Sequence, residues 1–185
     1  HVYFSGRVLT DVLSTFFIIL TVFFFWEGFE KGKTKYKLLF GIFLAFSILA
    51  RYTSIGIIPI FPIYLIIKNR NFSFLKDKFL WLAIVLFLIT LIPWSIYGIM
   101  NYGNPLGAFI HGAKASSYWG GTQPWYFFFK FSLPMFSILS ITFLGSLFFI
   151  ISNKKIKKDP AIILLLLWFF IFFIFTSIIP HKESR

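Results

Sequence analysis

The chain has 185 residues, of which 58% are hydrophobic, 23% are aromatic and only 13% carry a charge. A soluble domain carries about 25% charged residues, so this composition is that of a membrane protein. The net charge of +12 comes from cations in short segments between apolar runs, which argues for membrane topology and against a nucleic-acid partner, and the lack of cysteine excludes thiol nucleophiles, disulfides and thiolate metal sites.

The first predicted span covers residues 9–28 and follows a polar and aromatic lead-in that contains Arg7 and Asp11. After it, the segment from Glu27 to Lys37 alternates lysine with glycine and threonine. We interpret this segment as a short, solvated, basic loop. It is assigned to the cytoplasmic side, because cytoplasmic loops carry an excess of Lys and Arg.

The next apolar stretch, residues 38–67, is too long for one span. As a single helix it would measure about 45 Å, against a hydrocarbon core of about 30 Å. Two short spans, 36–50 and 53–67, return the following basic loop to the cytoplasm. Arg51 then lies in a turn at the outer surface, where it avoids a cost of about 3 kcal/mol at the bilayer centre. Two prolines make the second of these spans irregular.

The fourth predicted span covers residues 79–97, and an outer loop, residues 98–124, follows it. Aromatic side chains crowd this region as an aromatic belt does at the headgroup level. They are Trp94, Tyr97, Tyr102, Tyr118, Trp119, Trp125 and Tyr126. An interfacial helix is predicted to begin at Pro124.

The fifth and sixth predicted spans, residues 131–151 and 161–179, flank a third basic loop with four lysines. Asp159 and Pro160 form a good N-cap and first-turn pair for the sixth span. The closing sequence Pro-His-Lys-Glu-Ser-Arg, residues 180–185, then lies outside. It places three cation-capable side chains and one carboxylate at the mouth of the membrane.

We therefore predict an all-α fold, a polytopic membrane helix bundle of about six transmembrane helices with an outer aromatic-rich loop. Twelve of the 18 Lys and Arg residues fall in the three assigned inner loops, which supports this topology. Residues 1–185 form a single transmembrane domain with both ends outside. Since the chain begins without Met and stops just after a span, we interpret it as an internal piece of a longer protein.

On the outer side, the predicted topology leaves only two carboxylates, Asp11 and Glu183. Asp11 lies just inside the apolar start of the first span, where an uncompensated charge is costly. Arg7, one helical turn away, is within reach as a partner. The pair either holds the helix end, or Asp11 belongs to an acidic site whose other members lie upstream.

The outer cations Arg51, His181, Lys182 and Arg185 could gather around a phosphate, because a forked guanidinium matches phosphate oxygens. The alternative is that these side chains reach toward lipid headgroups. Glu183, which lies among them, adds nothing to headgroup attraction and favours a site. Two further residues, Trp125 and Tyr126, are either belt residues or stack against a sugar ring or an isoprenoid tail.

No cofactor is evident from the sequence. Three scattered histidines without cysteine give no metal-ligand spacing. A glycine-rich phosphate loop and a nucleophile elbow are also absent from the sequence, so a nucleotide site is not indicated.

Four stretches, in this order, resemble the multi-spanning C-type membrane glycosyltransferases, and most closely the dolichyl-phosphate-mannose protein mannosyltransferase-like group, which includes the lipid A aminoarabinose transferases. They are SGRVLTDVLSTFF, LLFGIFLAFSILARYTSIGIIPIFPIYL, PWYFFF and IPHKESR. The ending is also similar to the HKE-x-R-F signature of mannosyltransferases that build lipid-linked oligosaccharides.

The resemblance implies a glycosyltransferase that takes a hexose or pentose from a polyprenyl- or dolichyl-phosphate carrier. It would pass the sugar to a protein, lipid or glycan acceptor on the outer or lumenal face. A multi-pass location is implied, in the cell membrane if the protein is prokaryotic, with membrane lipids as further partners and no nucleic acid. The leading base of the family lies in a first outer loop that precedes this sequence, so the piece is expected to be inactive alone. A divalent metal could be held only by such upstream residues.

The resemblance also assigns roles to the outer residues. Asp11 matches the second acid of the site. Glu183 would orient the neighbouring cations, and Trp125 and Tyr126 would contact the sugar or isoprenoid. The donor-phosphate contacts would be Arg7, Arg51, His181, Lys182 and Arg185.

A transporter or flippase of a lipid-linked anionic substrate is the alternative from another functional class. It too would need outer cations and broken helices. Transport would place ionisable residues near the bilayer midplane, and the predicted topology puts none there, which favours the enzyme.

Overall fold

The computed structural model describes residues 2–119, 126, 145–146, 152 and 159–178. The described elements are helical, without strands, so the predicted all-α fold is confirmed. In chain order they are α1 (Val2–Phe25), the π-helix η1 (Trp26–Glu30), α2 (Thr34–Ala50), the 3-10 helix η2 (Tyr52–Ile57), α3 (Ile60–Asn69), the 3-10 helix η3 (Ser73–Lys76), α4 (Lys78–Tyr102), α5 (Gly107–Trp119) and α7 (Pro160–Ile178).

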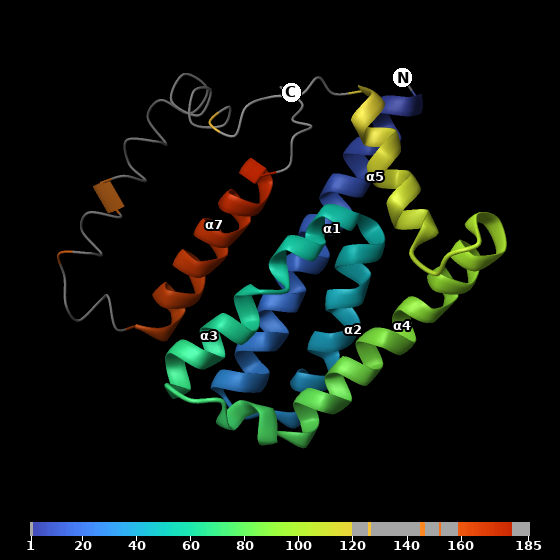
Figure 1. Ribbon diagram of the computed structural model, residues 1–185. Helices are drawn as coiled ribbons and strands as arrows, with labels where there is room; N and C mark the ends of the chain where they lie inside the picture. Colours follow the sequence, from blue (N-terminus) through green and yellow to red (C-terminus); the bar gives the residue numbers. More distant parts are fainter. Residues whose placement is uncertain (1, 120–125, 127–144, 147–151, 153–158, 179–185) are drawn as a thin grey trace.

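The helices run between two ends of a bundle (Figure 1). The start of α1, the turn at Arg51 and α5 lie at one end, which we call the Arg51 end. The other end, which we call the lysine end, holds η1, the connector between α3 and α4, and the start of α7. Its described cations are Lys31, Lys33, Lys35, Lys37, Lys68, Arg70, Lys76 and Lys78.

An aromatic cluster holds the lysine end of the bundle together. The fully buried ring of Phe25 lies 5.4 Å from Phe40, 4.7 Å from Phe61 and 5.6 Å from Tyr64, measured between ring centroids. These rings come from α1, α2 and α3, and Leu164 of α7 joins the same cluster. Aromatic pairs contribute about 0.5–1.5 kcal/mol each beyond the area they bury, so the cluster fastens four helices to one another.

Small residues let α2 and α4 approach closely. A Cβ added at Gly41 would stand 2.1 Å from the carbonyl oxygen of Ala83, so no larger residue fits there without moving a helix. Small residues are common at the interfaces of membrane helices because they let the backbones approach closely. Such helices associate by van der Waals packing, since in lipid there is little hydrophobic driving force between them.

The stretch 38–67 is not one continuous helix. α2 ends at Ala50, Arg51 is extended, and η2 begins at Tyr52. The expected break at Arg51 is therefore present. The part of this stretch after Arg51 is irregular. The 3-10 helix η2 ends before Pro59 and α3 begins after it, because Pro59 has no backbone N–H to donate to a continuing helix.

Two parts of the chain are more helical than expected. α1 already begins at Val2, within the predicted lead-in. The predicted outer loop 98–124 is helical over most of its described part, because α4 continues to Tyr102 and α5 follows after a short turn. Gly103 adopts the left-handed conformation, φ 68, and the Asn104 side chain accepts a hydrogen bond from the backbone N–H of Leu106. This turn contains Gly103, Asn104 and Pro105, residue types that favour turns.

Three described helical stretches are long and apolar enough to cross a bilayer, namely Thr10–Glu30, Tyr52–Asn69 and Lys78–Tyr102. Together with the all-α fold, they make this a membrane protein. The predicted spans 36–50 and 161–179 coincide closely with α2 and α7. Because the predicted span 131–151 lies almost wholly outside the described residues, the number and sidedness of the spans stay predictions.

Candidate functional site

An ion pair joins α1 to the turn after α2 at the Arg51 end. The Nη1 of Arg51 donates a hydrogen bond to Oδ1 of Asp11, from 40 residues away in the sequence. The Asp11 side chain is 33% exposed and that of Arg51 is 40% exposed. The ion pair is therefore partly exposed at the surface of the bundle, where a ligand could contact both charges.

A second polar pair lies on the same two segments. The Oγ of Ser14 on α1 is 2.8 Å from the Oγ of Ser54 on η2, again with an offset of 40 residues. Both serines are buried, at 4% and 2% exposure. On α1, Ser14 follows Asp11 by three residues and so lies on the same face of the helix. On the other segment, Ser54 lies in η2, three residues after the extended Arg51. The buried hydroxyl pair therefore holds the Arg51 turn against α1.

The helix α5 covers the same end of the bundle. It contacts η2, where a Cβ added at Gly112 would stand 3.9 Å from the Tyr52 ring. His111 of α5 stacks on Tyr102 with ring centroids 4.3 Å apart. Lys114 lies exposed on the same helix, so α5 brings a further cation to the Arg51 end.

The structure brings together two of the residues that the sequence singled out, Asp11 and Arg51. Arg7 lies on α1 one turn before Asp11, and its side chain is outside the described part of the structure. Tyr126 is described by itself and is 49% exposed. The remaining candidates, Trp125, His181, Lys182, Glu183 and Arg185, lie outside the described residues.

Sequence reasoning missed Ser14 and Ser54. The available signal was their shared spacing, Asp11-x-x-Ser14 and Arg51-x-x-Ser54, in otherwise apolar surroundings. A serine on an apolar helix can satisfy its hydroxyl on its own backbone, as Thr21 does with the carbonyl of Phe17. Spacing alone therefore could not show that these two hydroxyls meet.

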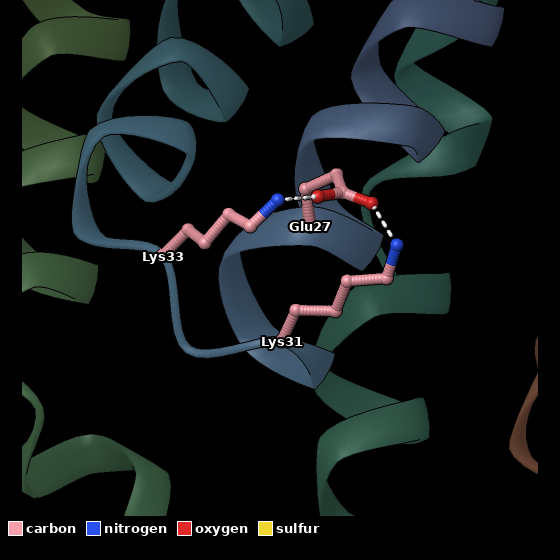
Figure 2. A network of polar contacts seen from close by, with 3 residues as sticks. All are labelled: Glu27, Lys31 and Lys33. Carbon is pink, nitrogen blue, oxygen red and sulfur yellow. Dashed lines mark hydrogen bonds and ion pairs between the residues drawn. The ribbon is translucent and has the colours of Figure 1, made fainter.

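At the lysine end, the burial of Glu27 contradicts the prediction of a solvated loop. The segment 27–37 was predicted to be solvated, but the Glu27 side chain is only 8% exposed. It accepts hydrogen bonds from Lys31 and, at 2.6 Å, from Lys33 (Figure 2). The contact with Glu27 raises the pKa of Lys33. Glu27 lies in the π-helix η1, and both lysines follow η1 in the segment that leads to α2.

Two further ion pairs join separate helices at the lysine end. Lys68 lies 2.7 Å from Glu30, which also accepts a hydrogen bond from the Tyr64 hydroxyl. Lys37 donates to Asp77 at 2.5 Å. Burial alone would raise the pKa of Asp77, but the hydrogen bonds from Lys37 and from the backbone N–H of Phe79 hold that pKa below its usual range. These carboxylates fasten helices together and are occupied by cations.

Within the described ranges, no group of three or more His, Asp or Glu residues gathers as a metal site would require. The chemistry available where Asp11 and Arg51 meet is that of a carboxylate and a guanidinium, with two buried hydroxyls beside them. A carboxylate can accept a proton, and a guanidinium can bind a phosphate.

Fold and site together define an all-α membrane protein with an open acid–cation pair at one end of its bundle. Over residues 2–97, more than half of the chain, the sequence matches the family model of dolichyl-phosphate-mannose-protein mannosyltransferases. The chain therefore belongs to this family and is a membrane glycosyltransferase of the mannosyltransferase type. The matched segment includes both members of the Asp11–Arg51 pair. No curated protein and no solved structure matches the chain.

Proposed function

We propose that this protein transfers a sugar from a polyprenyl-phosphate-linked donor to an acceptor on the outer or lumenal face of a membrane. The observation that carries this proposal is the ion pair between Asp11 and Arg51, which is open to a ligand and lies within the family match. A lipid-phosphate donor requires a cation for its phosphate, and an acceptor hydroxyl requires a base. In the ion pair, the cation Arg51 and the carboxylate Asp11 lie next to each other.

Arg51 is proposed to bind the donor phosphate. Its side chain is 40% exposed, and its guanidinium has donors beyond the one used by Asp11. A fork of N–H groups matches phosphate oxygens in a bidentate manner. When a phosphate binds Arg51, the guanidinium is shared between the phosphate and Asp11.

The proposed reaction is a direct displacement at the anomeric carbon of the sugar. The acceptor oxygen forms a bond to this carbon while a carboxylate of the site takes the acceptor proton. The bond between the anomeric carbon and the phosphate oxygen breaks, and the polyprenyl phosphate leaves with the electron pair. Arg51 stabilises the negative charge that develops on the departing phosphate, which is where preorganised charge has its largest effect.

The charge distribution supports the proposed side of the membrane. Eight described cations crowd the lysine end, whereas the described part of the Arg51 end has few. Segments rich in Lys and Arg stay in the cytoplasm. With the lysine end inside, the Arg51 end faces outward in a multi-pass arrangement, and His181, Lys182 and Arg185 are proposed to add to its phosphate site with Glu183 orienting them.

The experiment measures transfer of radiolabelled mannose from dolichyl-phosphate mannose in membranes that contain the full-length protein. We expect Asp11→Asn and Arg51→Gln to lower transfer by about 100-fold or more, the scale seen when one group that stabilises the transition state is removed. Asp77→Asn is the matched control, since it removes a carboxylate from another ion pair and keeps a side-chain oxygen at the α4 N-cap. It should retain transfer.

Wild-type transfer in both Asp11→Asn and Arg51→Gln would refute these assignments. Movement of the labelled lipid across the membrane without any transfer of sugar would instead support the transporter or flippase alternative. Between Asp11 and Glu27, α1 and the start of η1 carry no ionisable residue, so the described structure offers transport no charged group along this helix.

A further inference from the structure

The connector between α3 and α4 at the lysine end carries a surface that the proposed reaction does not use. It comprises Arg70, Phe72, Leu75, Lys76 and Lys78, which we call the connector patch. All five residues are exposed and lie within nine consecutive positions. The connector patch combines three cations with two apolar side chains, as segments that lie at a membrane surface do.

The two apolar members of the connector patch point away from the bundle. Phe72 is 64% exposed and Leu75 is 44% exposed, while the intervening Phe74 packs against the buried core. The Nε1 of Trp81 donates a hydrogen bond of 2.8 Å to the carbonyl of Leu75 and so ties the connector to α4. Phe72 and Leu75 are therefore held outward by a fixed backbone.

The exposed apolar surface continues from the connector patch onto α4. Trp81, Leu82 and Val85 are 53%, 43% and 47% exposed. Since α4 is one of the helices long and apolar enough to cross a bilayer, this face is suited to lipid chains. The connector patch thus adjoins the N-terminal end of the apolar face of α4.

The cations of the connector patch have no carboxylate partner among the described residues, unlike four of the five other cations described at the lysine end. Lys31, Lys33, Lys37 and Lys68 each form an ion pair, whereas Arg70, Lys76 and Lys78 form none there. The carboxylate within the connector, Asp77, is occupied by Lys37 and by the α4 N-cap. Three positive charges therefore face outward without compensation.

We infer that the connector patch binds anionic phospholipid at the membrane surface. The cations would contact lipid phosphates while Phe72 and Leu75 enter the boundary between headgroups and acyl chains. Anionic lipid matches both the positive charge and the apolar surface, whereas a free anion would leave Phe72 and Leu75 in water. This inference does not depend on the transferase activity or on the Asp11–Arg51 pair.

The test uses the full-length protein in bilayers with spin-labelled phosphatidylglycerol or phosphatidylcholine, and it measures the ratio of their association constants at the protein surface. We expect the wild-type protein to prefer phosphatidylglycerol and to lose this preference as NaCl is raised. The variant Arg70→Gln/Lys76→Gln/Lys78→Gln should lower the ratio by about fivefold or more. The salt titration needs no variant and so does not depend on how the variant folds.

Matched single substitutions separate the connector patch from the rest of the molecule. Lys76→Gln should lower the ratio and Lys114→Gln, at the Arg51 end, should not. Leu75→Ser should weaken lipid association, whereas Leu106→Ser, which replaces another exposed leucine between two helices, should not. Equal effects of the patch and control substitutions would overturn the inference.

Two other outcomes would also overturn it. Loss of the lipid preference on adding inorganic phosphate at constant ionic strength would identify a site for free anions. A change of oligomeric state in Phe72→Ser, with the lipid ratio unchanged, would identify a protein interface. Transfer of mannose is measured in the same preparations, so failure of this inference is distinguished from failure of the proposed reaction.

Discussion

The Oγ of Ser14 lies 2.8 Å from the Oγ of Ser54, and this buried contact lies one helical turn from the ion pair between Asp11 and Arg51. The hydroxyl pair is almost inaccessible, while the charged pair is partly open. The hydroxyl pair and the ion pair therefore have different roles. The serines hold α1 and η2 in register, and the charges stay available to a ligand.

Ser14→Ala should lower stability by about 1–3 kcal/mol, because it leaves the buried Ser54 hydroxyl without its partner. Ser14→Ala/Ser54→Ala should cost less than the sum of the two single substitutions, since neither hydroxyl is then orphaned. Thermal unfolding in detergent measures both. Strictly additive effects would mean that the two hydroxyls are not coupled.

Gly41→Ala should destabilise the bundle and separate α2 from α4, because the new Cβ would stand 2.1 Å from the Ala83 carbonyl oxygen. Overpacking of this kind costs about 1–3 kcal/mol. Gly112→Ala is the matched control, since its new Cβ meets its first neighbour at 3.9 Å. Both variants are compared by thermal unfolding, and an unchanged melting temperature in Gly41→Ala would contradict the close helix contact.

The ion pair between Lys37 and Asp77 predicts a dependence of stability on acid pH. The folded-state pKa of Asp77 is lowered, so its contribution is fully present above the ordinary Asp pKa of about 3.9. It is lost as pH falls through the lowered value, because the protonated carboxyl no longer pairs with lysine. Melting temperatures measured between about pH 6 and pH 2 should fall less steeply in Asp77→Asn than in the wild type. Parallel curves would contradict this.

The contacts of Glu27 predict redundancy between two lysines. Lys31→Gln or Lys33→Gln alone should change the melting temperature little, because the other lysine still neutralises Glu27. Lys31→Gln/Lys33→Gln should lower it by more than the sum of the single effects, since a carboxylate that is 8% exposed then lacks its cations. The double substitution Lys35→Gln/Lys76→Gln, at exposed positions without a described ion pair, removes the same charge as a control.

The sequence by itself determined the class of protein and much of the helical layout. Long uncharged runs such as that of α4 must satisfy their backbone groups internally in lipid, so they form helices whatever their neighbours are. The same reasoning placed a break at Arg51, since a guanidinium in the middle of an apolar run is costly. The family resemblance also marked Asp11 and Arg51 before the structure placed them side by side.

Only the tertiary structure decided which side chains meet across helices. Helical periodicity predicted Arg7 as a partner of Asp11 because both lie on one helix. The contact of Asp11 with Arg51, 40 residues away in the sequence, could not be predicted in this way. The contact of Ser14 with Ser54 and the close approach of Gly41 to Ala83 likewise depend on how separate helices pack. Helical spacing specifies neighbours within a helix, but register and approach between helices follow from the packing of whole surfaces, which no short sequence pattern contains.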